Sequence, residues 1–117
     1  MLASKEFIIR LAANQHMGTS LTDDFAMYLH EMGLSEYEAS SYLCLLQIGV
    51  ATAKEVAEGA DVPQSRVYDV LDNLESKGFI TTQQGRPKKF GPVEPEIAVN
   101  QFIQYKRTKL KEMIAQD

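Results

Sequence analysis

The sequence is poor in the residues that form covalent or metal cross-links. Its 117 residues include one cysteine, two histidines and no tryptophan, and it has no long hydrophobic run. Cys44 lies in the apolar run 42–46, which predicts a buried thiol in a reducing cytosol rather than a disulfide. One cysteine and His30 cannot build a structural zinc site without several carboxylates. We therefore expect one small cytoplasmic domain with no bound metal and no membrane span.

The motifs of common enzymes are also missing. The sequence has no glycine-rich loop that would cradle a phosphate, and a domain of this size cannot enclose a cleft with paired carboxylates. We expect no catalytic residue, no cofactor and no small-molecule effector site. The protein is therefore not expected to be an enzyme.

Positive charge is concentrated locally, although the formal net charge is −4. Residues 1–53 hold two basic and six acidic side chains, whereas residues 54–91 hold six of each. In this second segment the positive charges gather at Arg86, Lys88 and Lys89. Binding to a polyanion should therefore be local and sensitive to salt.

Capping motifs and glycines predict two helices in the first half of the chain. Residues 21–32 carry apolar side chains at helical spacing, ahead of a glycine at position 33: Leu21, Phe25, Tyr28, Leu29 and Met32. Ser35 and Glu38 form a capping box for a second helix over residues 37–48, ended by Gly49. The apolar face expected for this second helix consists of Tyr42, Leu43, Leu45, Leu46 and Ile48.

Two short helices and a hairpin are predicted over residues 52–90. Thr52 and Glu55 form a capping box, and Pro63 suits the first turn of the next helix, which ends at Gly78. The inner face of that next helix is an apolar stripe of Val67, Val70, Leu71 and Leu74. A strand over 79–82, a turn over 84–87 and a returning strand from 88 complete the hairpin, and a last helix is expected from about residue 94.

This order of elements is that of a winged helix-turn-helix, a mainly α fold with a small β-hairpin. We expect the winged helix-turn-helix domain to cover residues 17–93 and a C-terminal dimerisation helix to cover residues 94–117. Residues 1–16 are expected to be an expression-tag segment. The sequence Gly18-Thr19-Ser20 after Met17 looks like a cloning junction next to a natural start.

Five segments carry a resemblance to a known family: GLSEYEA at 33–39, ATAKEVA at 51–57, VPQSRVYDVL at 62–71, LESKGFI at 74–80 and GRPKKF at 85–90. Together they closely resemble the DNA-binding domain of the TrmB-like archaeal transcription regulators, over roughly residues 21–110. The resemblance implies a winged-helix protein that binds double-stranded DNA, often as a dimer. Full-length members carry a further C-terminal domain that senses sugars. This chain ends before such a domain, so no sugar site is expected in it.

Nine residues are predicted to contact DNA. The N-terminal end of a recognition helix faces base edges in the major groove, and a wing reaches phosphates or the minor groove. Gln64 and Arg66 can bond adenine or guanine edges, and Ser65 or Tyr68 can bond a phosphate. The full set is Thr52, Lys54, Gln64, Ser65, Arg66, Tyr68, Arg86, Lys88 and Lys89.

Several of these residues have a plain structural alternative. Arg66 can form an ion pair with Asp69 three residues later, and Tyr68 can be a half-buried packing residue. Thr52 can act by capping alone. Asp69 and Asp72 lie nearly opposite the apolar stripe, where they would repel phosphates, so we expect Asp69 to pair with a basic residue.

The last helix is more apolar than one small domain requires. We predict that it pairs with a second copy of the chain through Phe102, Ile103, Leu110, Met113 and Ile114. The alternative is that it folds back on its own core, and Lys106 weakens a strict coiled-coil pattern. A dimer would bind a pseudo-palindromic operator.

Sequence-specific binding of duplex DNA by a transcription regulator is thus the leading functional hypothesis. The alternative is a winged-helix module for protein–protein interaction in a larger assembly, whose acidic face would bind a basic partner. The net charge of −4 keeps this alternative open.

Overall fold

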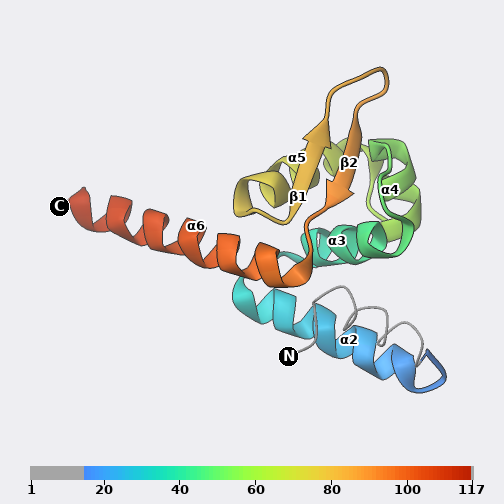
Figure 1. Ribbon diagram of the computed structural model, residues 1–117, viewed down its shortest axis with the longest axis horizontal. Coiled ribbons are helices and arrows are strands. Elements are labelled where there is room, and N and C mark those ends of the chain that lie inside the picture. Colours follow the sequence, from blue (N-terminus) through green and yellow to red (C-terminus); the bar gives the residue numbers. More distant parts are fainter. Residues whose placement is uncertain (1–14, 117) are drawn as a thin grey trace.

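The computed structural model describes residues 15–116, with side chains from residue 24 onward. The elements follow the order α2 (Gln15–Met32), α3 (Glu36–Ile48), α4 (Ala53–Ala60), α5 (Gln64–Lys77), β1 (Ile80–Gln83), β2 (Lys89–Pro92) and α6 (Pro95–Ala115). Figure 1 shows the hairpin projecting on one side of the helices and α6 extending away from them. The predicted mainly helical winged fold is confirmed. Most of the segment expected to be a tag lies outside the described residues.

The start of α2 differs from the sequence prediction. The helix begins at Gln15 rather than near Leu21, so it runs through residues 18–20 without interruption. Leu29 is fully buried and Phe25 packs against the core, whereas Tyr28 is 62% exposed. Tyr28 therefore does not belong to the inner face, because the core contacts a narrower stripe of this helix than the spacing predicted.

Helix α3 crosses the middle of the domain. Its predicted capping box is present: the Ser35 N–H donates to Glu38 Oε1 at 2.9 Å, and the Glu38 N–H donates to Ser35 Oγ at 3.1 Å. Tyr42 and Leu45 are fully buried, but Ile48 at the last position is 53% exposed, so its assignment to the apolar face was wrong. Ile48 is the last residue of the helix, and its side chain is largely exposed to solvent.

Helices α4 and α5 form the helix-turn-helix. The capping box of Thr52 and Glu55 opens α4, and Asp61 ends it in the left-handed conformation with φ of 56°. Pro63 then occupies the N-cap of α5. The two helices α3 and α4 approach closely, since a Cβ added at Gly59 would lie 2.7 Å from Cys44 Sγ. Cys44 is buried as predicted, and burial raises the pKa of its thiol.

The wing is an antiparallel hairpin in which Ile80 pairs with Pro92 and Gln83 pairs with Lys89. Each strand lies one residue later than the sequence predicted. Ala51 adds a bridge to Phe90 through two backbone hydrogen bonds of 2.9 and 2.7 Å. This bridge joins the base of the wing to the residues directly before α4.

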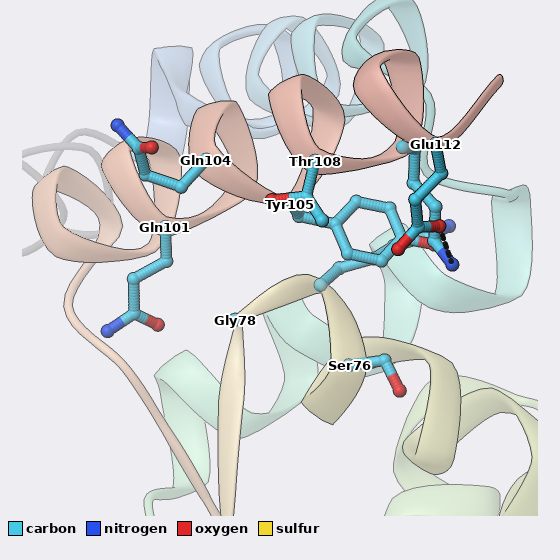
Figure 2. A pocket seen from close by; sticks show the side chains of 9 residues that line it. Ser76, Gly78, Gln101, Gln104, Tyr105, Thr108 and Glu112 are labelled. Carbon is cyan, nitrogen blue, oxygen red and sulfur yellow. Dashed lines mark ion pairs between the residues drawn. The ribbon is translucent and has the colours of Figure 1, made fainter. Parts of the chain in front are cut away.

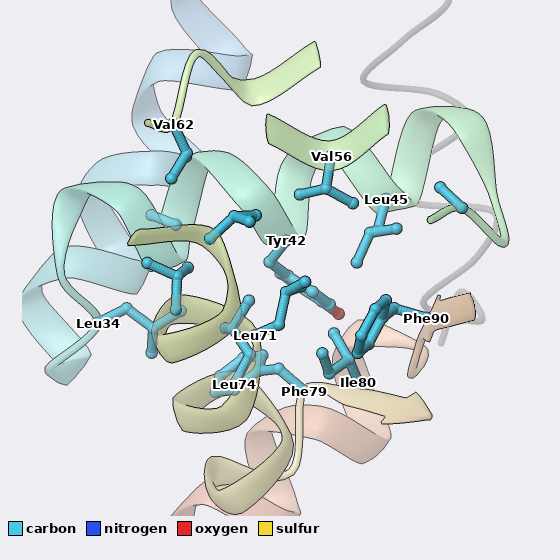
Figure 3. Close-up of a cluster of buried hydrophobic side chains, with 14 of the residues drawn as sticks. Leu34, Tyr42, Leu45, Val56, Val62, Leu71, Leu74, Phe79, Ile80 and Phe90 are labelled. Carbon is cyan, nitrogen blue, oxygen red and sulfur yellow. The ribbon is translucent and has the colours of Figure 1, made fainter. Parts of the chain in front are cut away.

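One hydrophobic core holds these elements together (Figure 3). The predicted inner stripe of α5 is confirmed, since Val67, Val70, Leu71 and Leu74 are all buried. Tyr42 lies among them and its hydroxyl donates to the Val93 carbonyl at 2.6 Å. Burial, followed by the nearby charge of Glu94, raises the pKa of this phenol far above its usual value. The Phe79 ring meets the Tyr42 ring edge-on, with centroids 5.0 Å apart.

The first turns of α6 pack on this core, and the rest of the helix leaves it. Phe102 is only 2% exposed and its ring lies 5.5 Å from that of Phe79, so it is part of the chain's own core rather than of an exposed dimerisation stripe. Gly78, which ends α5 with φ of 92°, allows this contact. A Cβ at Gly78 would lie 2.5 Å from Gln101 Cβ.

Candidate nucleic-acid interface

The N-terminal end of α5 presents a polar surface. Gln64, Ser65, Arg66 and Tyr68 are all exposed, while Val67 between them is fully buried. Tyr68 is 59% exposed, so the alternative that it packs half-buried is wrong. This geometry follows from helical periodicity, because an apolar stripe on one side leaves the remaining side chains free to contact a partner.

Arg66 has an aromatic partner that the sequence did not reveal. Its Cζ lies 5.6 Å from the ring centroid of Tyr37, a residue in the first turn of α3. The Arg66–Asp69 ion pair, the structural alternative for Arg66, is absent from the salt bridges of the described residues. The missed residue is Tyr37. Only the packing of α3 against α5 brings it near Arg66, and no local pattern in the sequence signals that packing.

The acidic residues of α5 do not have the partner that the sequence predicted. Asp69 and Asp72 are exposed, and neither forms an ion pair within the part of the chain that the structure describes. The expectation that a basic residue neutralises Asp69 was therefore wrong. Both carboxylates remain exposed on the helix, where they would repel a phosphate backbone.

The wing carries the predicted basic residues, with Arg86 and Lys88 in its loop and Lys89 at the start of β2. Arg86, Lys88 and Lys89 are all exposed, and none is in an ion pair within the described residues. In Figure 1 this loop lies at the outer tip of the hairpin, away from α2 and α6. Cations on a protruding, solvated loop suit contacts to phosphates.

The start of α4 lies beside the base of the wing. The N–H of Thr52 donates to Glu55 Oε1 at 2.8 Å, and the Glu55 N–H donates to Thr52 Oγ1 at 3.2 Å. Hydrogen bonds from the backbone and the hydroxyl of Thr52 lower the pKa of Glu55, and the positive charge of Lys89 adds a smaller effect in the same direction. Thr52 is thus a helix cap in the structure, and Lys54 next to it is exposed.

The other end of α5 is anchored by an ion pair. Lys77 Nζ lies 2.6 Å from Glu38 Oε1 and 3.4 Å from the Gly33 carbonyl oxygen. Glu38 is only 4% exposed, and it belongs to the capping box of α3. This contact holds the C-terminal end of α5 against the junction of α2 and α3.

Two surface cavities are lined by none of the nine residues predicted to contact DNA. A pocket of about 450 Å³ lies between the end of α5 and α6. Figure 2 labels seven of the residues that line it: Ser76, Gly78, Gln101, Gln104, Tyr105, Thr108 and Glu112. A second cavity of about 450 Å³ lies between α2 and α3, lined in part by Met27, His30 and Leu43. No group of His, Cys, Asp and Glu that could hold a metal occurs among the described residues.

The outer part of α6 exposes four of the five residues predicted to mediate dimerisation. Exposed fractions are 43% for Ile103, 57% for Leu110, 66% for Met113 and 72% for Ile114. The alternative that α6 folds back on the core holds only for its first turns. Among the described residues no helix is long and apolar enough to cross a bilayer.

The sequence is similar to those of known transcriptional regulators. Residues 29–96 match the family described as sugar-specific transcriptional regulator TrmB. The chain is 43% identical over 79 residues to the DNA-binding HTH-type transcriptional repressor TrmBL2 of Thermococcus kodakarensis. That match covers 68% of this chain and 30% of the relative, so the chain spans less than two thirds of the relative's length.

Two solved structures have a similar fold. TrmBL2, described as an archaeal chromatin protein with a novel mode of DNA binding, matches with a TM-score of 0.68 and 40% identity, over 81% of this chain and 36% of that one. A MarR family regulator from Silicibacter pomeroyi matches with a TM-score of 0.55 and 18% identity, over 87% and 71% of the two chains, which shows a shared fold. The family match spans more than half of the chain and includes the helix-turn-helix and the wing. The chain therefore belongs to the TrmB family of transcriptional regulators.

Proposed function

We propose that the protein regulates transcription by binding specific sequences of double-stranded DNA. The N-terminal end of α5 enters the major groove, and the loop of the wing contacts the backbone or the minor groove. The observation that carries this proposal is the exposure of Gln64, Ser65, Arg66 and Tyr68 at one end of α5. Membership of a family of transcriptional regulators supports it, as does the name of the Thermococcus relative, a DNA-binding repressor.

Within this interface the residues have different roles. Gln64 and Arg66 read base edges, since their side chains can form paired hydrogen bonds with adenine and guanine. Arg86, Lys88 and Lys89 bind phosphates and supply most of the salt-dependent affinity. Most of the sequence specificity therefore comes from very few side chains, because Asp69 and Asp72 occupy much of the outward face of α5.

We also propose that the protein acts as a homodimer, joined through the exposed apolar residues of α6. A helix that leaves its own domain with Leu110, Met113 and Ile114 exposed gains stability by burying them against a second copy. Two copies related by a two-fold axis would place two recognition helices on a pseudo-palindromic site.

Selection of bound fragments from random duplex DNA, followed by anisotropy titrations at several salt concentrations, tests the proposal. The wild-type protein should enrich a pseudo-palindrome. Replacing Arg86, Lys88 and Lys89 by alanine should reduce the magnitude of the negative log–log salt slope by up to about 3 per wing, with a large loss of affinity at low salt. Replacing Arg107, Lys109 and Lys111 of α6 by alanine is the matched control, since it removes the same charge far from the wing. Absence of binding at low salt would contradict the proposal.

A second candidate function is DNA coating with little sequence preference. It is favoured by the 40% identity to TrmBL2, which is described as a chromatin protein. The same selection separates the two functions, because a coating protein would bind duplexes with similar affinity whatever their sequence. The protein-interaction module considered above would instead show affinity for a protein partner and none for duplex DNA.

A further inference from the structure

Arg66 is the one basic residue of α5 that is not committed to an ion pair in the described residues. The helix contains two basic residues, and the other, Lys77, contacts Glu38 at 2.6 Å. Asp69 and Asp72 share the exposed side of the helix. Among the described residues, the guanidinium of Arg66 is therefore the only positive charge of α5 that is free of an ion pair and available to DNA.

The ring of Tyr37 holds that guanidinium. Arg66 Cζ lies 5.6 Å from the ring centroid, within the distance at which a cation is attracted by an aromatic face. Tyr37 is half-buried and packs against the core, so its ring has a fixed position. A guanidinium lying over a ring keeps its N–H donors at its edge, where they remain available to an acceptor.

The backbone that carries Tyr37 is also fixed. Ser35 and Glu38 close the capping box on either side of it, and the hydroxyl of Ser40 donates to the Tyr37 carbonyl at 3.2 Å. Glu38 is in turn bound by Lys77 at the far end of α5. Thus α5 contacts the first turn of α3 at two points, through Arg66 on Tyr37 and through Lys77 on Glu38.

Asp69 is the competing partner for Arg66. Residues three positions apart on a helix are neighbours, so an Arg66–Asp69 ion pair would be expected if nothing else held the arginine. Such a pair would neutralise the only available cation of the helix. The contact with Tyr37 takes its place in the structure, where no ion pair involving Arg66 occurs among the described residues.

We propose that Tyr37 is a positioning residue for DNA recognition: its ring keeps the Arg66 guanidinium out of an ion pair with Asp69 and presents it to the DNA. Tyr37 itself does not need to touch the nucleic acid. The inference rests on the proposed DNA-binding function and adds to it a residue outside the helix-turn-helix.

A set of variants tests this role by fluorescence anisotropy on a selected duplex. Tyr37→Leu should weaken binding about threefold to tenfold, whereas Tyr37→Phe, which keeps the ring, should bind like the wild type. The loss should shrink when Tyr37→Leu is combined with Asp69→Asn, since the competing carboxylate is then gone. In an Arg66→Ala background, Tyr37→Leu should have no further effect.

Controls separate positioning from folding. Tyr105→Leu removes a ring of α6 that carries Lys109 at the same 5.6 Å, and it should leave DNA affinity unchanged. Circular dichroism should show equal helix content in all variants. In NMR spectra, the ring-current shift of the Arg66 side-chain protons should disappear in Tyr37→Leu and persist in Tyr37→Phe, a readout that needs no DNA.

Each outcome decides a separate point. If the wild type binds no duplex, the proposed function fails and the positioning role fails with it. If the wild type binds and Arg66→Ala weakens binding but Tyr37→Leu does not, only the positioning role is overturned. An equal loss from Tyr37→Leu in the presence and absence of Asp69 or Arg66 would also overturn it.

Discussion

Glu38 joins two helices through one carboxylate. It accepts a hydrogen bond from the Ser35 N–H, and Lys77 contacts it at 2.6 Å from the far end of α5. The two side chains are 5% and 17% exposed, so neither charge is well solvated. The ion pair on α6 differs, because Lys109 and Glu112 lie 3.7 Å apart and are more than half exposed.

Neutralising Glu38 should therefore destabilise the folded protein. We expect Glu38→Gln to lower the free energy of unfolding by about 1 to 3 kcal/mol, since Lys77 would keep a partly buried charge without its counter-ion. Glu112→Gln is the matched control and should change stability by less than about 0.5 kcal/mol. Urea unfolding followed by circular dichroism measures both. If both substitutions lower the free energy of unfolding equally, the burial of the Lys77–Glu38 pair does not make it more stabilising than the exposed Lys109–Glu112 pair.

The partners of single charged residues could not be predicted from the sequence. The spacing of Arg66 and Asp69 allowed an ion pair as an alternative, but the structure places Arg66 over Tyr37, which is distant in sequence. For Lys77 the sequence indicated no partner at all. Such contacts depend on how α3 packs against α5, whereas a sequence pattern reports only neighbours on the same helix.

At the scale of single elements, the two capping boxes define where α3 and α4 begin. Each pairs a hydroxyl with a main-chain N–H and a glutamate with the cap's own N–H. For Thr52→Ala we expect a loss of about 1 kcal/mol in the free energy of unfolding, because an N–H at the start of α4 then loses its acceptor. Thermal unfolding of the variant beside Thr52→Ser, which keeps the hydroxyl, measures this. A Thr52→Ser variant as unstable as Thr52→Ala would contradict the capping role.

The same box predicts a dependence on pH. The pKa of Glu55 is lowered in the folded protein, chiefly by the hydrogen bond from the Thr52 backbone, so the ionised carboxylate stabilises the fold. This stabilisation is present above the pKa of an unfolded glutamate, about 4.3, and is lost as the pH falls through the lower pKa of the folded state. The melting temperatures of wild type and Glu55→Gln should therefore differ at pH 7 and converge in acid. A difference that does not shrink as the pH falls would contradict this.

Element boundaries were predictable where a local signal marks them. Gly78 ends α5 at the expected position, and both capping boxes are present. The start of α2 was wrong by six residues, since the helix begins at Gln15 rather than Leu21. The apolar spacing that begins at Leu21 does not mark the first residue of the helix, because a helix can extend beyond its apolar stripe.

At the scale of the whole molecule, α6 combines two roles that the sequence presented as alternatives. Its first turns pack on the core through Ala98 and Phe102, which are both buried. Its last turns carry exposed Leu110, Met113 and Ile114 away from the domain (Figure 1). The helix thus leaves an apolar stripe without a partner in the described chain.

Dimerisation should depend on this stripe. We expect light scattering to give a dimer for the wild type at micromolar concentration and a monomer for Leu110→Ser with Met113→Ser, since both side chains would lose burial against the second copy. Ile48→Ser is a matched control, because Ile48 is 53% exposed on α3 and lies outside the stripe. A monomeric wild type would remove the dimer from the proposed function.

The sequence by itself determined the order of the elements, the inner face of α5, the basic loop of the wing and the family of the chain. These features depend on signals within a few residues, such as a cap, a glycine or a helical spacing. Only the tertiary structure decided that Phe102 belongs to the core, that Lys77 binds Glu38 and that Arg66 lies over Tyr37. Each of these contacts joins helices that are distant in sequence, so its geometry exists only after the helices have packed.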